Sequence, residues 1–437
     1  MPSYTELLRR LAGQEHALRY WDTLSDHQRT TFAVQLLSLN LDELRQLYQR
    51  RHETSVLPAP ERIGPVSVIP PDSKQHVERG IDALSRGEVA VLLVAGGQGS
   101  RLGFDAPKGF YPVGPLSRKS LFQLHAEKVL ALQQRYGGRV FTLIMTSPAT
   151  HGPTVAFFEH HRYFGLTPSD VAFFQQGTMP ALCLETGKLL LETPSSLFLS
   201  PDGHGGTLTA LASSGLLSQL RERGVRTVFY FQVDNPLVRI ADPAFLGHHL
   251  AAQAEVSSKV VAKRNAVERA GVFATMDGRC VVIEYSDLPR SLAEETQADG
   301  RLRLWAGSPA IHAFDLEFLQ RMTGEGCLPF HVARKKVPHV DDPSPVRENA
   351  LKFERFIFDV LPRAERWLLM ETRREEEFAP LKNASGDDSP ATVRAALLAD
   401  SARRLQQAGA EVVGEVEVSP LYRLEDFSGR QVSGYVE

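Results

Sequence analysis

The 437-residue sequence contains few cysteines, little net charge and no long hydrophobic run. Its three cysteines, Cys183, Cys280 and Cys327, are odd in number and widely spaced, so they predict neither a disulfide framework nor a zinc site. We interpret them as small buried hydrophobic residues of a protein in the reducing cytoplasm. A net charge of −3 without a basic block gives no electrostatic reason to expect a nucleic-acid partner. No apolar run approaches the length that crosses a bilayer, and the N-terminus lacks a signal-peptide core, so we expect no membrane partner.

The chain is organised around a glycine-rich stretch, residues 91–119. A buried strand is predicted from Val89 to Ala95, where seven apolar residues follow one another. Glycines then occupy positions 96, 97, 99 and 103, with Arg101 and Lys108 close by. The next helix is expected to begin at Ser120, a residue type that caps helices. This order of strand, glycine loop and helix can present backbone N–H groups to an anion with no Cβ in the way.

Two common phosphate-binding loops do not match this stretch. The fingerprint G-x-G-x-x-G, started at Gly97, requires glycine where the chain has Leu102. The Walker loop requires Gly-Lys-Ser/Thr, whereas Lys108 stands between Pro107 and Gly109. What remains is A-G-G-x-G-x-R-L-G followed by P-K-G, which resembles the signature loop of sugar-nucleotide pyrophosphorylases. The alternative is a glycine-rich turn that carries a surface arginine and lysine.

Strand and helix patterns alternate from the glycine loop to about residue 330. Further strands are predicted at Val140 to Thr146, Val171 to Gln175, Thr227 to Val233, Ser258 to Ala262, Val272 to Met276 and Cys280 to Tyr285. Helices are predicted at Lys74 to Arg86, Ser120 to Tyr136, Thr150 to Tyr163, Thr207 to Arg223 and Ala244 to Ala254. Such alternation predicts an α/β fold, a mostly parallel central sheet with helices on both faces. Ligands of these sheets bind at the carboxyl ends of the strands.

The two ends of the chain follow other patterns. Apolar residues at helical spacing predict helices up to about residue 50, and a proline-rich connector follows. After Lys352, the run Phe353 to Phe358 is interpreted as an aromatic helix face. A helix from Thr392 to Gln407 and strands within Val412 to Val418 are predicted to form a small α+β piece. We therefore expect a helical N-terminal segment and linker at residues 1–72, a nucleotide-binding α/β domain at 73–345 and a small C-terminal α+β domain at 346–437.

A series of motifs in one order carries a family resemblance that covers nearly all of the chain. The motifs are GQEHALRYWDTL, the glycine loop, MTSPAT, FFQQGTMPAL, SPDGHGGTLTAL, FQVDNPLVRIADPAF, VIEYSDLP, HVARKKVPHVD and EFAPLKNASG. The chain resembles the eukaryotic-type UDP-N-acetylglucosamine pyrophosphorylases, within the wider UDP-sugar pyrophosphorylase family. The resemblance implies a Rossmann-like central domain between flanking domains. It also implies uridylyl transfer between UTP and a sugar 1-phosphate with Mg²⁺ as cofactor. The sequence does not determine the oligomeric state, and a monomer is slightly favoured.

The chemistry of this transfer matches the residue types at the strand ends. The nucleophile is already an anionic phosphate oxygen, so it needs no activated serine, cysteine or histidine. The protein must bring two polyanions together and neutralise the charge that grows on the bridging and leaving oxygens. Loop amides, arginine, lysine and a divalent metal held by a carboxylate meet this need.

The resemblance implies a role for each matching position. Nucleotide-binding residues are Ala95, Gly96, Gly97, Gln176, Gly203 and His204; catalytic cations are Arg101, Lys108 and Lys352; sugar-binding residues are Glu284, Tyr285 and Ser308; and Asp234 would hold Mg²⁺. Gln176 would read the uracil edge through one donor and one acceptor. Plainer interpretations stay open: Gln176 as a turn residue, Asp234 as a loop cap, Glu284 as an edge-strand charge and Lys352 as a solvated lysine.

Two positions depart from the acetylglucosamine enzymes. His204 in G-H-G-G stands where those enzymes usually have asparagine, and a G-H-G turn is similar to UDP-glucose and broad UDP-sugar enzymes. Ser308, in W-A-G-S-P, replaces an asparagine that contacts the sugar, and a missing amide can change selection strongly. We expect N-acetylglucosamine 1-phosphate as substrate, with glucose 1-phosphate or broad specificity as the alternative. Two further functions stay open, a transferase for GTP or CTP and a catalytically silent sugar-nucleotide sensor.

Overall fold

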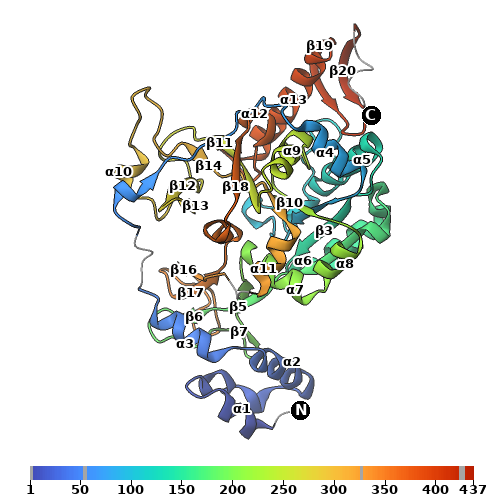
Figure 1. Ribbon diagram of the computed structural model, residues 1–437. Helices are drawn as coiled ribbons and strands as arrows, with labels where there is room; N and C mark the ends of the chain where they lie inside the picture. Colours follow the sequence, from blue (N-terminus) through green and yellow to red (C-terminus); the bar gives the residue numbers. More distant parts are fainter. Residues whose placement is uncertain (1–2, 53–56, 325–327, 423–428) are drawn as a thin grey trace. The chain divides into compact units, whose positions relative to one another are not determined.

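The computed structural model describes residues 3–52, 57–324, 328–422 and 429–437 (Figure 1). They separate into two compact units, each assembled from three segments of the chain. The smaller unit comprises Met1–Leu57, Gln176–Thr207 and Leu328–Asp359, and the larger unit comprises Pro58–Gln175, Leu208–Cys327 and Val360–Glu437. The linear three-domain division at residues 72 and 345 stays a prediction.

The larger unit is built on a mixed sheet that contains eleven strands within the described residues. Their bounds are β1 Ile63–Gly64, β2 Val89–Val94, β3 Phe141–Thr146, β4 Val171–Gln175, β10 Thr227–Gln232, β11 Val256–Ala262, β12 Val272–Met276, β13 Arg279–Ile283, β14 Ala306–Gly307, β15 His312–Asp315 and β18 Trp367–Glu371. The order across the sheet is β1-β12-β14-β11-β15-β10-β2-β3-β4, with β13 paired to β12 and β18 to β11.

Four of these strands form the parallel core of the sheet. Strands β4, β3, β2 and β10 are adjacent and run in one direction, with Val94 in register with Met145 on one side and Gln232 on the other. Strand β18 is parallel to β11, whereas β15 is antiparallel to both β10 and β11. The predicted α/β class with its mostly parallel central sheet is confirmed. Since β2 precedes β3 and β4 on one side and β10 lies on the other, the strand order reverses between β2 and β10, where open α/β sheets bind ligands.

Helices fill both faces of this sheet, which explains the unbroken apolar run of β2. Their bounds in the larger unit are α4 Val77–Ser85, α5 Leu121–Tyr136, α6 Pro148–His160, α8 Leu216–Glu222, α9 Pro243–Ala251, α10 Arg290–Ala293, α11 Leu316–Gly324, α12 Arg374–Glu377 and α13 Pro390–Gln407. Val91 and Leu93 share one core cluster with Phe122 of α5 and Phe245 of α9. Leu92 points to the opposite face and is equally buried. Ser120 caps α5 by accepting the Gln123 N–H at 3.1 Å, as predicted.

Two helix predictions were wrong. The single helix expected over Thr207 to Arg223 is two helices, α7 Thr207–Ser213 and α8, because Gly215 between them has a left-handed φ of 73°. The aromatic helix face after Lys352 is not a helix face either. Phe353 lies in strand β17, Ala350–Glu354, and a 3₁₀ helix covers Ile357–Arg363. Pairing of β17 with two strands distant in sequence overrides its local pattern.

The smaller unit packs N-terminal helices and short strands around one core. Its elements are α1 Tyr4–Arg10, α2 Asp26–Leu37, α3 Leu41–Gln49, β5 Thr178–Pro180, β6 Leu182–Cys183, β7 Leu191–Thr193, β8 Ser196–Leu197, β9 Leu199–Pro201, β16 His331–Lys335 and β17. A capping box of Ser3 and Glu6 begins α1. Leu7 and Phe32 from the helices share their core with Leu182 and Phe353 from the strands. The N-terminal helices are therefore one wall of a mixed α/β core rather than a separate helical layer.

The C-terminal part of the larger unit confirms the predicted helix and strand. Helix α13 packs against the two-stranded parallel sheet of β19 Glu411–Val418 and β20 Gln431–Val436 (Figure 1). Leu405 of α13 and Val416 of β19 lie in its small core. Cys280 is buried, as predicted for the cysteines, Cys183 is partly exposed, and Cys327 lies outside the described residues.

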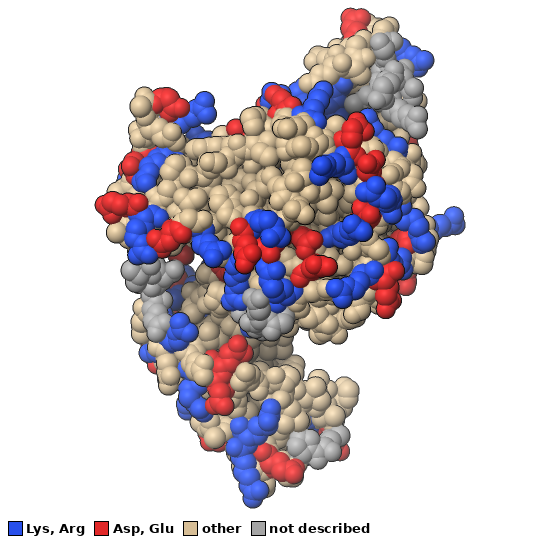
Figure 2. Space-filling model, in the orientation of Figure 1, with Lys and Arg blue, Asp and Glu red and all other residues tan. Residues whose placement is uncertain are grey.

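The surface carries both signs of charge. On the face that Figure 2 shows, lysine and arginine side chains are interspersed with aspartate and glutamate. This mixture agrees with the small net charge of −3. Among the helices that the structure describes, each is too short or too polar to pass through a lipid bilayer.

Candidate functional site

The glycine loop at the end of β2 closes on itself through backbone hydrogen bonds. The Lys108 N–H donates to the Gly97 carbonyl at 3.0 Å, and the Gly99 N–H donates to the Ala106 carbonyl at 2.9 Å. A Cβ on Gly99 would lie 2.7 Å from the Phe104 carbonyl oxygen, so no other residue fits there without movement. Ala95 is buried, while Gly97 is exposed. The loop therefore has a fixed shape with exposed backbone at its start.

Lys108 and Asp234 meet at the carboxyl edge of the parallel core. Lys108 belongs to the loop after β2, and Asp234 follows β10, the parallel neighbour of β2. The Lys108 Nζ lies 3.1 Å from the Asp234 Oδ2, and both side chains are more than four-fifths buried. The sequence predicted a cation and a metal-binding carboxylate at these strand ends. The structure shows them in direct contact at the point where the strand order reverses.

The loop that carries Asp234 is held from behind by residues 377–381. The Asp234 carbonyl accepts the Leu381 N–H at 2.8 Å. The buried Asn235 donates its Nδ2–H to the Glu377 carbonyl at 2.7 Å and accepts the Ala379 N–H at 3.1 Å. Because these bonds use both ends of the Asn235 amide, they fix the backbone on either side of it. The position of Asp234 thus depends on a segment more than 140 residues away in sequence.

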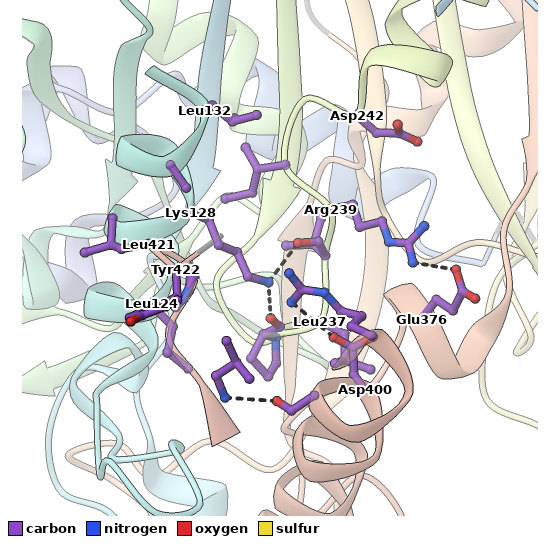
Figure 3. A pocket seen from close by; sticks show the side chains of 18 of the residues that line it. Leu124, Lys128, Leu132, Leu237, Arg239, Asp242, Glu376, Asp400, Leu421 and Tyr422 are labelled. Atoms are coloured by element: carbon purple, nitrogen blue, oxygen red, sulfur yellow. Dashed lines mark hydrogen bonds and ion pairs between the residues drawn. The ribbon is translucent and has the colours of Figure 1, made fainter. Parts of the chain in front are cut away.

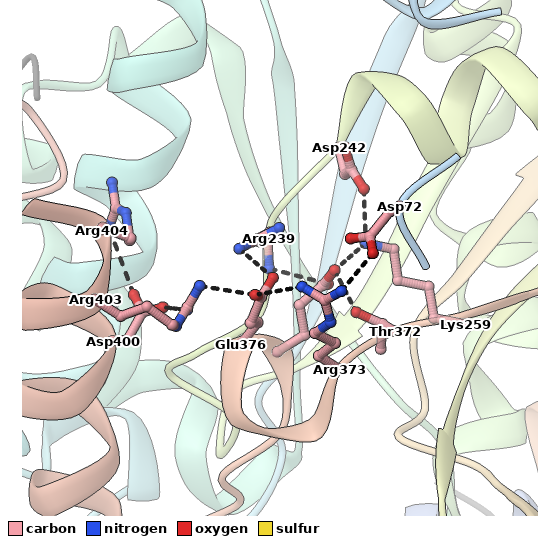
Figure 4. Close-up of polar contacts among 11 residues, drawn as sticks. Asp72, Arg239, Asp242, Lys259, Thr372, Arg373, Glu376, Asp400, Arg403 and Arg404 are labelled. Atoms are coloured by element: carbon pink, nitrogen blue, oxygen red, sulfur yellow. Dashed lines mark hydrogen bonds and ion pairs between the residues drawn. The ribbon is translucent and has the colours of Figure 1, made fainter. Parts of the chain in front are cut away.

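A buried ion network supports that segment in turn (Figure 4). Lys259 of β11 is 1% exposed and lies between the carboxylates of Asp242, at 2.9 Å, and Glu377. Burial opposes its charge, but the two carboxylates outweigh this effect and raise the pKa of Lys259. Arg239 forms an ion pair with Glu376 at 2.6 Å. Both ends of the loop from Asp234 to Asp242 are therefore attached to α12.

Lys382 follows the backbone that contacts Asp234, a position that the sequence did not indicate. It directly follows Leu381, whose N–H bonds to the Asp234 carbonyl, and its side chain is partly buried. The segment P-L-K-N that contains it carries part of the family resemblance, but its spacing alone indicates no role for the lysine. The missing information was the pairing between the Asp234 loop and residues 377–381, which sequence spacing does not reveal.

Arg101 differs from Lys108 in its surroundings. It lies on a 3₁₀ turn, Ser100–Leu102, with its side chain exposed. Within the residues that the structure describes, its guanidinium forms no hydrogen bond or ion pair. A predicted phosphate-binding arginine that has no protein partner keeps its five donors for a ligand.

The donor set at Asp234 fits Mg²⁺ in a limited way. Mg²⁺ is commonly held by one or two carboxylates together with substrate phosphates, and it keeps several waters. The described residues contain no cluster of three histidine, cysteine or acidic side chains that could hold a metal ion alone. Asp234, with Lys108 on its Oδ2, is a single carboxylate next to the glycine loop. This arrangement suits a metal that arrives with the nucleotide phosphates.

Two predicted sugar-binding residues meet around Gly271. The Ser308 N–H donates to the Gly271 carbonyl at 2.9 Å. A Cβ on Gly271 would lie 3.0 Å from the Glu284 Oε1, so the carboxylate lies against this glycine. Tyr285 is 48% exposed, next to the turn in which the Glu284 carbonyl accepts the Asp287 N–H. The structure therefore brings together Glu284, which follows β13, and Ser308, which follows β14, in the larger unit.

A second glycine turn, Gly203 to Gly206, lies in the smaller unit and is packed against the backbone of Arg355. The Gly205 N–H donates to the Arg355 carbonyl at 2.8 Å. A Cβ on Gly203, whose φ is 84°, would lie 2.5 Å from that carbonyl oxygen, and one on Gly205 would lie 2.6 Å from its carbon. Close packing within the protein therefore requires glycine at both positions. Contact between this turn and a base stays a prediction.

Gln176 is buried at the start of the same unit, beside a carboxyl group that the sequence did not single out. The neighbouring Gly177 accepts the Asp202 N–H at 3.0 Å through its carbonyl, and its Cα lies against the Asp202 carboxylate. Asp202 is 5% exposed, and its Oδ1 has no hydrogen-bond partner within the described residues. Burial raises the pKa of Asp202 to about 6, although nearby Arg355 opposes this. Gln176 and Asp202 are thus two buried polar residues in the unit that contains the glycine turn.

The side chain of His204 is engaged with the protein. Its ring stacks on Phe356 at 5.3 Å between centroids, and its Nδ1 accepts the Ile357 N–H at 3.1 Å. Burial lowers the pKa of His204 to about 4, so the ring is neutral at neutral pH. A role of His204 in nucleotide binding stays a prediction. Because its ring contacts Phe356 and Ile357, such a role would belong to the His204 backbone.

Lys352 lies on strand β17, directly before Phe353. Its ammonium is 4.9 Å from the centre of the Phe198 ring. Burial is the main cause that lowers the pKa of Lys352, and Lys335 adds to it. Lys352 and Lys108 lie in different units, so the catalytic role of Lys352 stays a prediction.

Comparisons with known proteins show which family the chain belongs to. The family described as UTP–glucose-1-phosphate uridylyltransferase matches residues 47–417. The UDP-N-acetylglucosamine pyrophosphorylase of Saccharomyces cerevisiae is 36% identical over 454 residues, 97% of this chain and 95% of that protein. The UDP-N-acetylhexosamine pyrophosphorylase-like protein 1 of Mus musculus is 40% identical over 91% of this chain and 84% of its own length.

A solved structure shows the same fold. The uridine diphosphate N-acetylglucosamine pyrophosphorylase of Trypanosoma brucei, in complex with an inhibitor, superposes with a TM-score of 0.85 and 28% identity. The match covers 97% of this chain and 93% of that chain. The chain therefore belongs to the UTP–glucose-1-phosphate uridylyltransferase family, a family of nucleotidyltransferases that includes the pyrophosphorylases of UDP-sugars.

Proposed function

We propose that the protein transfers the uridylyl group of UTP to N-acetylglucosamine 1-phosphate, which yields the UDP-sugar and pyrophosphate. The observation that carries this proposal is the contact of Lys108 with Asp234 beside the glycine loop, at 3.1 Å. This is the arrangement that two polyanions require, and the relatives named for N-acetylglucosamine cover most of the chain.

In this reaction, a phosphate oxygen of the sugar 1-phosphate attacks the α-phosphorus of UTP. The new P–O bond forms while the bond to the β-phosphate oxygen breaks, and pyrophosphate leaves with the electron pair. The amides of the loop from Gly97 would face the nucleotide phosphates. Lys108 and Arg101 would neutralise charge on the bridging and leaving oxygens, and Lys382, which follows Leu381 in sequence, would be a third cation.

Asp234 is the residue that would hold Mg²⁺, which when bound supplies positive charge to the phosphate oxygens. The bonds of Asn235 to Glu377 and Ala379 keep Asp234 in place before substrate binds. Such preorganisation costs no rearrangement during the reaction. Mg²⁺, rather than another divalent ion, is our proposal, and replacing it with Ca²⁺, which prefers more ligands and longer distances, should reduce turnover.

A second candidate substrate is glucose 1-phosphate. Two features of the sequence favour it. Ser308 lies where the acetylglucosamine enzymes have asparagine, and the G-H-G turn that contains His204 is similar to that of UDP-glucose enzymes. Pyrophosphate release with UTP over a panel of sugar 1-phosphates tests both substrates. We expect the highest kcat/KM with N-acetylglucosamine 1-phosphate, and release with none of the sugars would overturn the proposal. The same panel with GTP and CTP tests the choice of nucleotide.

We also propose that the protein acts in the cytoplasm as a monomer. Three scattered cysteines fit a reducing compartment. Size-exclusion chromatography with light scattering should give a mass near 48.4 kDa. A mass twice as large would contradict the monomer. A catalytically silent sensor would instead bind UDP-sugar without pyrophosphate exchange, and a thermal-shift measurement beside the activity assay separates the two functions.

A further inference from the structure

The larger unit contains a cavity of about 960 Å³ that includes none of the predicted site residues (Figure 3). Its walls are α5, the loop of residues 236–243, α13 and residues 417–422. Small-molecule sites typically have about 300–1,000 Å³ and are lined by apolar side chains with a few convergent polar groups. Leucines from all four walls provide the apolar part: Leu124, Leu132, Leu237, Leu397 and Leu421.

The charges in the cavity wall favour an anion. The wall contains four carboxylates and four cations. The carboxylates already have donors: Asp242 from Lys259, Glu376 from Arg239, Asp400 from Arg404, and Glu417 from the backbone of Leu116 and Ser117. Within the described residues, Lys128 and Arg135 form no ion pair. The wall therefore has positive charge left over for a ligand.

Lys128 of α5 is the group most suited to bind an anionic ligand. Its ammonium donates to the Val238 carbonyl at 2.9 Å and also to the Pro236 carbonyl. An ammonium has three N–H donors, and no described residue accepts the third. Figure 3 shows Lys128 between the leucines of the wall, with dashed lines to the loop carbonyls. A buried ammonium with one free N–H is costly unless an acceptor, such as an anionic ligand, completes its hydrogen bonds.

We propose that this cavity is a second binding site, for a small organic anion whose carboxylate or phosphate contacts Lys128 and whose apolar body lies against the leucines. The site differs from the proposed catalytic site, and its ligand differs from UTP and sugar 1-phosphate in needing an apolar body. The inference does not rest on the proposed function.

The loop that forms one wall connects this cavity with Asp234. Residues 236–240 line the cavity, and Asp234 lies two residues before Pro236 in the same loop. Lys128 holds this loop by two of its carbonyls, so an anion that binds Lys128 acts on the backbone that carries Asp234. Occupation of the cavity should therefore change the stability of the loop, as an effector does.

The acidity of Lys128 gives the site a pH dependence. Burial lowers the pKa of Lys128 to about 7, with Asp400 and Glu377 opposing and Arg404 and Arg239 reinforcing the effect. The charged form that binds an anion is lost as the pH rises through 7. Affinity for an anion should therefore fall between pH 6 and pH 8, while affinity for a neutral molecule should not.

Two fluorescent probes with the same aromatic body test the proposal. One is 8-anilinonaphthalene-1-sulfonate, and the other is N-phenyl-1-naphthylamine, which lacks the sulfonate. We expect Lys128→Met to weaken the sulfonate probe at least tenfold and the neutral probe less than threefold. Leu132→Trp, which fills the cavity, should weaken both. Arg221→Met, an exposed cation on α8, is the matched control and should change neither.

Three further results complete the test. Excess UTP should leave the sulfonate probe bound, and hydrogen exchange at residues 234–238 should slow when it binds. If Lys128→Met does not fold by circular dichroism, Leu132→Trp and the pH series on the unaltered protein decide the question. Displacement of the probe by UTP, or equal binding by Lys128→Met, Leu132→Trp and the unaltered protein, would overturn the proposal.

Discussion

At the scale of single residues, the account depends on Lys108. It is one of two loop cations predicted from sequence, and the structure adds that its ammonium lies on the Asp234 carboxylate. A partly buried ion pair of this kind stabilises both groups and also holds the cation where phosphates would arrive. The pair therefore links the glycine loop to the carboxylate that we propose as the metal ligand.

Lys108→Met should lower kcat at least tenfold with little change in folding. The substitution keeps the apolar stem and removes the charge that neutralises the phosphate oxygens, a loss of about 1.4 kcal/mol or more in transition-state stabilisation. Steady-state kinetics with UTP and the thermal melting curve check both parts. Lys74→Met, an exposed lysine before α4, is the control. Turnover within twofold of normal would remove Lys108 from the catalytic residues.

Ser308→Asn should change the preference among sugars. The backbone of Ser308 is held by the bond from its N–H to the Gly271 carbonyl, beside Glu284, and its Oγ accepts the Ala310 N–H at 3.3 Å. An added amide at a hydrogen-bonded sugar site can shift selection by about tenfold or more. We expect the ratio of kcat/KM for N-acetylglucosamine 1-phosphate over glucose 1-phosphate to rise, as measured by pyrophosphate release. An unchanged ratio would show that Ser308 does not contact the sugar.

At the scale of elements, the second glycine turn shows how packing and function can use the same residue type. The family resemblance implied that the turn at Gly203 and His204 binds the nucleotide. The structure shows that Arg355 already occupies the space where a Cβ would be. A glycine turn in sequence therefore indicates close approach, but it does not say what approaches.

Gly205→Ala should destabilise the protein by about 1–3 kcal/mol, because its Cβ would lie 2.6 Å from the Arg355 carbonyl carbon. Gly152→Ala, inside α6 with open space around the new Cβ, is the matched control and should stabilise by up to about 1 kcal/mol. Urea unfolding followed by circular dichroism compares the two. If both variants unfold at the same urea concentration, the Arg355 backbone does not pack closely against Gly205.

The sequence predicted elements better than it predicted their connections. Strands such as Val171–Gln175 were predicted with their observed bounds, because apolar runs between polar breaks depend on local composition. The meeting of Lys108 and Asp234 could be inferred, since both follow strands of one parallel sheet. Lys382 was missed, and the run from Phe353 was predicted as a helix face, because both positions depend on pairing with other segments of the chain.

At the scale of the whole molecule, buried histidines should make stability depend on pH. Burial lowers the pKa of His125 to about 3 and those of His204 and His249 to about 4. Unfolded histidine takes up protons near pH 6.5. Their contribution to the free energy of unfolding is therefore complete above pH 6.5 and is lost as the pH falls toward 4. The loss is about 1.4 kcal/mol for each histidine and each pH unit. Asp202, whose pKa is raised to about 6, has the opposite effect on stability as the pH falls, but it is one group and the histidines are three.

The melting temperature should therefore be lower at pH 5.5 than at pH 7.5, and differential scanning calorimetry measures it. His204→Asn removes one of the three groups and should reduce the difference. His160→Asn, an exposed histidine at the end of α6, should leave it unchanged. A melting temperature that is equal or higher at pH 5.5 would contradict the assignment of these histidines as buried and neutral.

The central claim is that the loop after β2 and the carboxylate after β10 hold the phosphates of a uridine nucleotide. A crystal structure of the protein with its UDP-sugar product bound tests this claim most directly. We predict that the diphosphate contacts the backbone of the loop from Gly97, with Arg101, Lys108 and Asp234 around it, and that the uracil lies at Gln176. A diphosphate bound away from Lys108 and Asp234 would contradict the account.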